Sequence, residues 1–86
     1  MYVLEGECLR VDRGNSAPGY KMIKNLDSAA KCAAECNKDS RCKSFAYTPT
    51  CHLKSTAAIF IKVINVISGN KADCKGKVHN NKCSYN

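Results

Sequence analysis

The chain has 86 residues, a net charge of +7 and seven cysteines, and its length fits one domain. This cysteine density is typical of a disulfide scaffold in an oxidising compartment, which argues against a nucleic-acid-binding protein of a reducing compartment. The positive charge therefore indicates acidic partners such as sulfated glycans, anionic cell surfaces or acidic proteins. The longest apolar run, residues 57–67, contains Lys62 and Asn65 and falls well short of the roughly 20 residues that cross a bilayer.

Residues 1–7 are expected to form a loosely held leader. They are too few and too acidic for a signal peptide. A disulfide-rich chain without an export signal is expected to be an excised module of a longer secreted protein. Alternation from Cys8 to Asp12 predicts a first strand, and alternation over 19–24 predicts a second. Between them, 13–19 is rich in turn formers and predicts an exposed loop.

A helix is predicted over Ser28–Asn37, with Asp27 or Ser28 as its N-cap. Its small residues fall on one arc of the helical wheel, so the helix can lie close against the layer it covers. These residues are Ala29, Ala30, Cys32, Ala33, Ala34 and Cys36.

Period-two alternation predicts a strand over Cys42–Tyr47, followed by a turn at 48–50 and a second hairpin strand over Cys51–Lys54. The strongest β run, 59–67, is apolar on both sides, so it should be a central strand or have a covered edge. A turn is expected at 68–70. The tail, 75–86, is polar and basic and is expected to be a linker, with Cys83 in it.

Cys32 and Cys36 lie one helical turn apart on the inner face, and a bridge between them would fit disulfide geometry poorly. Each should therefore reach a different partner. We expect Cys36 to pair with Cys42 and Cys32 with Cys51. Six cysteines allow 15 connectivities and the choice of the odd cysteine multiplies these by seven, so spacing alone does not select one.

The central stretch resembles the PAN/apple domain family over about residues 8–74. The resemblance rests on Cys32-x3-Cys36-x5-Cys42-x2-Phe45-x-Tyr47 and Cys51-x-Leu53-Lys54-Ser55, with Gly19-Tyr-Lys-Met-Ile before and Ser68-Gly-Asn-Lys-x2-Cys74 after. It implies an α+β fold: an antiparallel sheet of about five strands with one helix packed on it. It divides the chain into the leader 1–7, the domain 8–74 and the tail 75–86.

The resemblance also implies the same nested pairing of the inner cysteines, with an outer bridge from Cys8 to Cys74. Cys83 is then a free or inter-module thiol. The alternative is a Cys8–Cys83 bridge that leaves Cys74 free.

Catalytic and metal chemistry find little support in the residues. Cys32, Cys36, Cys51 and His52 are residue types that bind zinc. However, Cys51 and His52 are neighbours on a predicted strand, so their side chains should point to opposite faces and seldom bind one ion. Reactive dithiols usually occur as Cys-x-x-Cys, which is absent. His52 and His79 are the only histidines, and neither belongs to a nucleophile–base arrangement. We therefore expect neither an enzyme nor a cofactor.

Binding remains as the expected function. Lys38, Arg41, Lys43 and Lys54 surround the predicted hairpin and are candidate ligand-binding residues, to which Lys75, Lys77 and Lys82 of the tail could add. The opposite interpretation is that a charge dispersed over the whole chain serves only solubility.

The Cys-x-Leu-Lys-Ser ending, the absence of tryptophan and the lysine richness are most similar to apple repeats of apicomplexan micronemal adhesins. That similarity implies a secreted tandem module that binds a partner adhesin or a host-cell protein or glycan during attachment and invasion, next to further modules of its own chain. A sulfated-glycan module and the apple domain of a secreted protease zymogen are the alternatives. Nucleic acid and membrane insertion are not expected.

Overall fold

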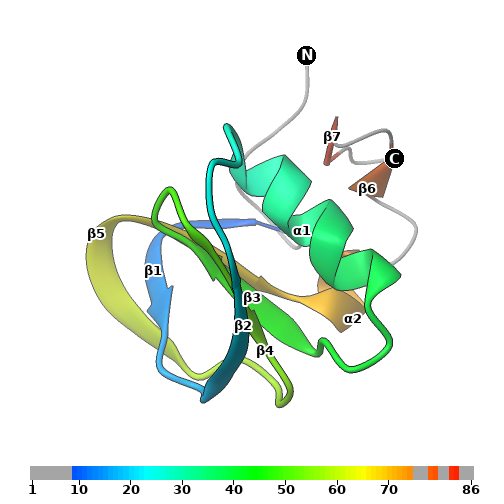
Figure 1. The fold of residues 1–86 in the computed structure, drawn as a ribbon. Coiled ribbons are helices and arrows are strands. Elements are labelled where there is room, and N and C mark those ends of the chain that lie inside the picture. The colour runs from blue at the N-terminus through cyan, green and yellow to red at the C-terminus, as the bar shows by residue number, and fades with distance from the viewer. Residues whose placement is uncertain (1–8, 75–77, 80–81, 84–86) are drawn as a thin grey trace.

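The computed structural model describes residues 9–74, together with the backbone of 78–79 and 82–83. A five-stranded antiparallel sheet in the order β1-β5-β3-β4-β2 forms its main layer, and one long helix, α1, packs on one face of it (Figure 1). The strands are β1 (Arg10–Asn15), β2 (Gly19–Ile23), β3 (Ser44–Tyr47), β4 (Cys51–Lys54) and β5 (Phe60–Asn70). This arrangement confirms the expected α+β class.

Helix α1 (Ala29–Lys38) begins where the sequence predicted, within one residue. The side chain of Ser28 caps it by accepting a hydrogen bond from the Lys31 backbone N–H at 3.2 Å. All six small residues of the predicted inner face are buried. The Tyr47 hydroxyl donates to the Leu26 carbonyl at 2.6 Å and fixes the chain just before the helix.

Two disulfides hold α1 in place. Cys32 is bonded to Cys51 of β4 and Cys36 to Cys42 after the helix, with Cα–Cα distances of 5.3 and 5.2 Å. These are the pairs expected from the sequence. Cys74 is disulfide-bonded as well, so the alternative that leaves it as a free thiol is wrong. The expected Cys8–Cys74 bridge involves Cys8, which lies outside the described residues, as does the side chain of Cys83.

The sheet is covered on both faces. Phe45 and Leu53 lie opposite each other on β3 and β4, and both are fully buried with Cys51 in the core beneath the helix. On the other face, Ser44 and Ala46 are buried as well. The predicted exposed loop at 13–19 is therefore wrong in part: β1 continues to Asn15, and the chain after it folds against this second face.

The Asn15 side chain makes several of the hydrogen bonds that hold the chain after β1 against this second face. Its side-chain Nδ2 donates to Ser44 Oγ at 2.9 Å, and its Oδ1 accepts from the backbone N–H groups of Ala17 at 3.0 Å and Ile59 at 3.1 Å. The Ser44 hydroxyl donates in turn to the Thr56 carbonyl at 2.7 Å. Because the amide is buried, these hydrogen bonds replace those that water would otherwise supply.

Strand β5 has two different halves. Ile67 and Ser68 pair with both β1 and β3, as expected for a central strand, and Gly69 and Asn70 continue the pairing with β3. The turn predicted at 68–70 is therefore wrong. Residues 60–62 pair only with β1 and form a two-stranded ribbon that curves away from the helix (Figure 1). The prediction of a central strand therefore holds for the second half alone.

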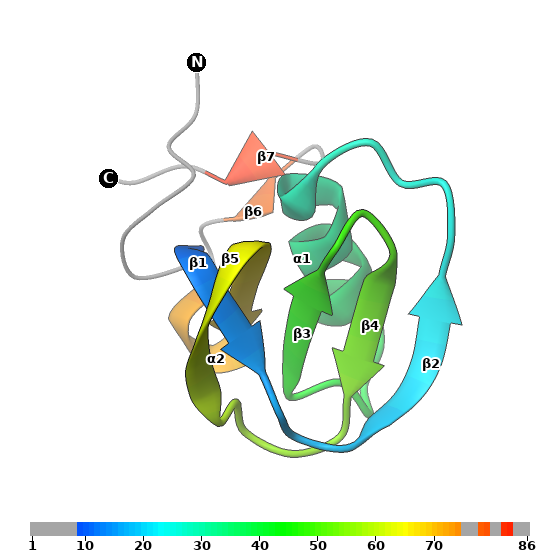
Figure 2. The same ribbon diagram turned by 90° about the vertical axis from the view of Figure 1, so that its left-hand side faces the viewer.

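The remaining elements lie around the helix. A single turn, α2 (Lys71–Cys74), follows β5, and β6 (Val78–His79) pairs with β7 (Lys82–Cys83) as a second, two-stranded sheet. These three elements contact α1. In Figure 2, β6 and β7 lie above the helix, while α2 lies on the same side of the picture as β1 and β5. No pattern in the sequence indicated these two short strands, because the polar, basic tail predicts a linker.

The two described disulfides should contribute unequally to stability. Loop-closure entropy predicts that replacing Cys32 and Cys51 with alanine lowers the free energy of unfolding by about 3 kcal/mol, and replacing Cys36 and Cys42 by about 2 kcal/mol. The difference follows from sequence separations of 19 and 6 residues. Urea denaturation of the two double variants measures it, and an equal loss would contradict the entropic account.

Asn15→Ala should lower the free energy of unfolding by about 2–3 kcal/mol, because it leaves Ser44 and the backbone donors of Ala17 and Ile59 without their partner. Asn37→Ala is the matched control, since Asn37 is exposed and takes no part in these hydrogen bonds. Thermal denaturation compares the two variants. Equal melting temperatures would show that the buried amide does not hold the second layer.

Candidate functional site

The four candidate cations do not form one surface. Lys54 lies half-buried on β4, and its Nζ donates to the carbonyls of Asn15 at 3.1 Å and Ala17 at 2.8 Å. Burial lowers the pKa of this ammonium group, because it removes water from the charge. Lys54 thus holds the chain after β1 against the sheet, and its charge is directed inward.

Lys38 and Arg41 lie together at the C-terminal end of α1, where acidic groups balance them. Lys38 Nζ is 2.9 Å from a carboxylate oxygen of Glu35, and the Arg41 guanidinium stacks over the Tyr20 ring at 4.5 Å from its centroid. The Arg41 backbone N–H donates to Asp39 at 2.9 Å, and this hydrogen bond is the main reason why the pKa of Asp39 is lowered. A shallow depression here has lysine and carboxylate side chains in its wall, so its charges largely cancel.

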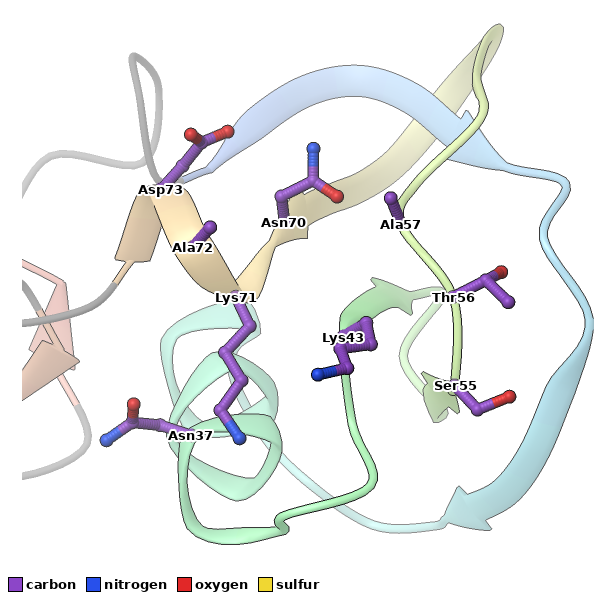
Figure 3. A pocket seen from close by; sticks show the side chains of 9 residues that line it. All are labelled: Asn37, Lys43, Ser55, Thr56, Ala57, Asn70, Lys71, Ala72 and Asp73. Atoms are coloured by element: carbon purple, nitrogen blue, oxygen red, sulfur yellow. The ribbon is translucent and has the colours of Figure 1, made fainter.

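Lys43 lies apart from the other three, in an open pocket of about 840 Å³ (Figure 3). The pocket is bounded by the end of α1, the segment after β4, the end of β5 and α2. Its lining residues are Asn37, Lys43, Ser55, Thr56, Ala57, Asn70, Lys71, Ala72 and Asp73.

Several of the polar groups in this pocket have structural partners. Lys71 Nζ donates to the Asp39 carbonyl at 2.8 Å, and Asn70 Oδ1 accepts from the Ala58 N–H at 2.7 Å. The Lys71 backbone N–H donates to the Lys43 carbonyl at 2.8 Å, which fixes α2 against the base of the pocket. These hydrogen bonds hold the walls together and leave other groups for a ligand.

The Lys43 ammonium group differs from these pocket groups, because it is available to a ligand. The side chain is exposed, and no hydrogen bond or ion pair to another described residue holds it. Figure 3 shows Lys43 between Lys71 on one side and Thr56 with Ser55 on the other. Asn37, Ser55 and Thr56 line the same pocket, and ammonium, amide and hydroxyl groups can hydrogen-bond a hydroxylated ligand and attract a carboxylate or sulfate.

Sequence reasoning identified Lys43 but missed the residues around it. Asn37 lies in α1, Thr56 in the loop after β4 and Lys71 in α2, and no spacing in the sequence marks them as neighbours. Lys75 and Lys77 lie outside the described residues, as does the side chain of Lys82, so the proposed contribution of the tail stays a prediction.

His52 is the remaining residue that the sequence singled out. It lies half-buried on β4, with Nε2 3.2 Å from Thr48 Oγ1. Burial, and then the charge of Lys54, lower the pKa of its imidazole below 6.5. Within the described part of the chain, no three His, Cys, Asp or Glu side chains are placed to hold a metal ion.

Comparison with known families matches a PAN domain to residues 12–85, so the chain belongs to the PAN domain family. PAN domains are modules of extracellular proteins that bind proteins or carbohydrates. No curated protein sequence matches the chain. Among the described residues, no helix is long and apolar enough to cross a lipid bilayer.

The depressed pKa of His52 predicts a pH dependence of stability. Below pH 6.5 the unfolded chain binds a proton that the folded imidazole resists, so the free energy of unfolding should fall as the pH drops through the folded pKa. NMR titration of the imidazole should give a midpoint below 6.5, and His52→Gln should remove this part of the acid-side loss. A midpoint at or above 6.5 would contradict the effect of burial.

Proposed function

We propose that this chain is a non-catalytic binding module of a multi-domain secreted protein of the micronemal adhesin type. Membership of the PAN family supports binding in an extracellular setting. The similarity of the Cys51-x-Leu53-Lys54-Ser55 ending to micronemal repeats supports the narrower assignment. Its targets are a partner adhesin or a host-cell protein or glycan during attachment, and neighbouring modules of the same chain add avidity through linkage.

The observation that carries this proposal is the exposed Lys43 ammonium group in a pocket rimmed by amides and hydroxyls. Two disulfides and the hydrogen bonds of Asn70 and Lys71 keep the walls in place, so a ligand meets a preorganised surface and little ordering opposes binding. The ligand group that suits the pocket is a carboxylate or sulfate flanked by hydroxyls, as on an acidic glycan.

A second candidate is a sulfated-glycan module in the strict sense, with affinity for heparin-like chains. The net charge of +7 favours it, because long-range attraction would add to the contact at Lys43. This candidate predicts a steep loss of affinity between low and physiological salt, whereas a protein-binding module predicts a modest one. The apple domain of a secreted protease zymogen is a third hypothesis. Identification of the binding partner would distinguish it from the other two hypotheses.

Lys43→Ala should weaken binding to a sulfated or carboxylated glycan by about tenfold, the loss expected for one charge-assisted hydrogen bond. Lys24→Ala is the matched control, because it removes the same charge from an exposed lysine that lines neither depression. Binding to an array of neutral, carboxylated and sulfated glycans measures both variants.

Equal losses in the two variants would show that only total charge matters, and the pocket proposal would then be wrong. Binding that both variants retain in full would place the glycan site elsewhere. If the unmodified chain binds none of these glycans, the glycan ligand is excluded and protein adhesion remains as the proposed function.

A further inference from the structure

The two faces of the β1–β5 ribbon carry different kinds of side chain. Arg13 of β1 pairs with Lys62 of β5, and two residues further along β1, Asn15 pairs with Phe60. Because successive side chains of a strand point to opposite faces, these four residues share one face of the ribbon. The other face carries Gly14 and the exposed aliphatic side chains of Ile61 and Val63. The cations therefore point away from the aliphatic side chains.

The Arg13–Lys62 pair consists of like charges directly opposite each other. Both side chains are exposed, and the Cβ atoms of such a pair lie about 5 Å apart. Like charges in this position destabilise an antiparallel sheet. Asp12 is the nearest acid in the sequence, but its Oδ1 accepts the Asn65 N–H at 2.9 Å, and in the described part of the chain no ion pair joins it to either cation. The ribbon therefore maintains a repulsion that a bound anion would relieve.

The other carboxylates of the described residues lie in or beside the helices. Four residues carry them: Asp27, Glu35, Asp39 and Asp73. The ion pairs of the described chain, Lys31 with Asp27 and Lys38 with Glu35, lie there as well. The ribbon face is therefore left with a net positive charge.

Arg10 adds a third cation to this face. The pairing register shifts between Val11 and Arg13, and beyond this irregularity the Arg10 guanidinium stacks over the Phe60 ring, 4.6 Å from its centroid. Stacking on the ring orients the guanidinium and leaves the N–H groups at its edge available. Arg13 Nη1 donates to the Asp12 carbonyl at 2.9 Å, which orients the second guanidinium and leaves its other donors for a ligand. Both groups are thus partly ordered before a ligand binds, which lowers the entropic cost of binding.

The ligand group that matches this arrangement is a phosphate monoester. Above its second pKa of about 6 it carries close to two negative charges and three acceptor oxygens. It can therefore offset Arg13 and Lys62 together, whereas a carboxylate or a sulfate ester carries one negative charge. A guanidinium group also binds two phosphate oxygens by parallel hydrogen bonds.

The placement of the aliphatic side chains disfavours a lipid bilayer as the source of this phosphate. Surfaces that bind the membrane interface bury apolar side chains at the boundary of the headgroups, where cations attract anionic lipids. Ile61 and Val63 would point away from a bilayer that met Arg13 and Lys62. A phosphorylated side chain of a protein imposes no such requirement.

We infer that the ribbon face formed by Arg10, Arg13 and Lys62 binds a phosphate monoester carried by a side chain of a protein partner. The phosphate lies between Arg13 and Lys62, and Arg10 attracts acidic groups that flank it. The anion site follows from the geometry of the ribbon, while the choice of a protein partner rests on the proposed binding function. None of these three cations lines the pocket around Lys43, so this is a second site.

Two methyl esters of the same tetrahedral shape test the anion site on the unmodified chain. At about pH 8 methyl phosphate is a dianion, whereas methyl sulfate is a monoanion. At equal ionic strength, methyl phosphate should shift the amide resonances of residues 10–15 and 60–62 of the ¹⁵N-labelled chain. Its affinity should be about tenfold higher than that of methyl sulfate, because the second charge acts on both cations. Equal affinities, or shifts that miss these residues, would overturn the inference.

Lys62→Gln tests the contribution of the paired cations. This variant should bind methyl phosphate about tenfold more weakly, and its melting temperature should not fall, because the change removes a like-charge repulsion. Lys24→Gln is the matched control, since it removes the same charge from an exposed lysine outside the ribbon, and its affinity should match that of the unmodified chain. Equal losses in the two variants would assign binding to net charge and overturn the site.

A serine-phosphorylated peptide with acidic flanking residues, compared with its unphosphorylated form, tests the partner class. Only the phosphorylated peptide should shift the ribbon resonances. Vesicles that contain phosphatidic acid, whose headgroup is also a phosphate monoester, should bind more weakly than this peptide, and tighter binding to the vesicles would overturn the protein partner. Shifts confined to Asn37, Lys43 and Thr56 would overturn the ribbon site and leave the proposed function standing.

Discussion

The hydrogen bonds of the buried Asn15 amide are the constraint on which both the pocket around Lys43 and the β1–β5 ribbon depend. Through Ile59 they fix the start of the β1–β5 ribbon, and through Ser44 they reach Thr56, which lines the pocket around Lys43. A small sheet with one helix can bury only one face well, and the other face here is closed by polar groups that satisfy one another. Lys54 holds the same segment by two further hydrogen bonds, to the carbonyls of Asn15 and Ala17.

Strand β5 connects the pocket around Lys43 with the ribbon. It starts just after Ala58 and ends at Asn70, and these residues are themselves joined by a hydrogen bond of 2.7 Å beside the pocket. The strand thus leaves the pocket, runs out as the ribbon and returns to the same place (Figure 3). The pocket is polar and centred on an exposed cation, whereas the ribbon exposes aliphatic side chains, so the two suit different chemical groups.

Local signals in the sequence were sufficient for the elements whose pattern is periodic. The small-residue face of α1, its Ser28 cap and the β3–β4 hairpin follow from spacing and capping rules, and the cysteine spacing pointed to the family. The second layer could not be predicted, because the polar residues from 13 to 19 resemble an exposed loop until Asn15 finds its partners 29 and 44 positions away. For the same reason Lys54 resembles a surface cation, although two backbone carbonyls engage its ammonium group.

The most direct test of this account is amide chemical-shift mapping of the chain with a heparin tetrasaccharide and with a neutral tetrasaccharide of equal length. The account predicts that the sulfated ligand shifts Asn37, Lys43 and Thr56 most strongly, because they surround the exposed ammonium group in the pocket. Shifts centred instead on Lys38 and Arg41, or spread evenly over all exposed lysines, would contradict a built site at Lys43 and leave only diffuse electrostatic attraction.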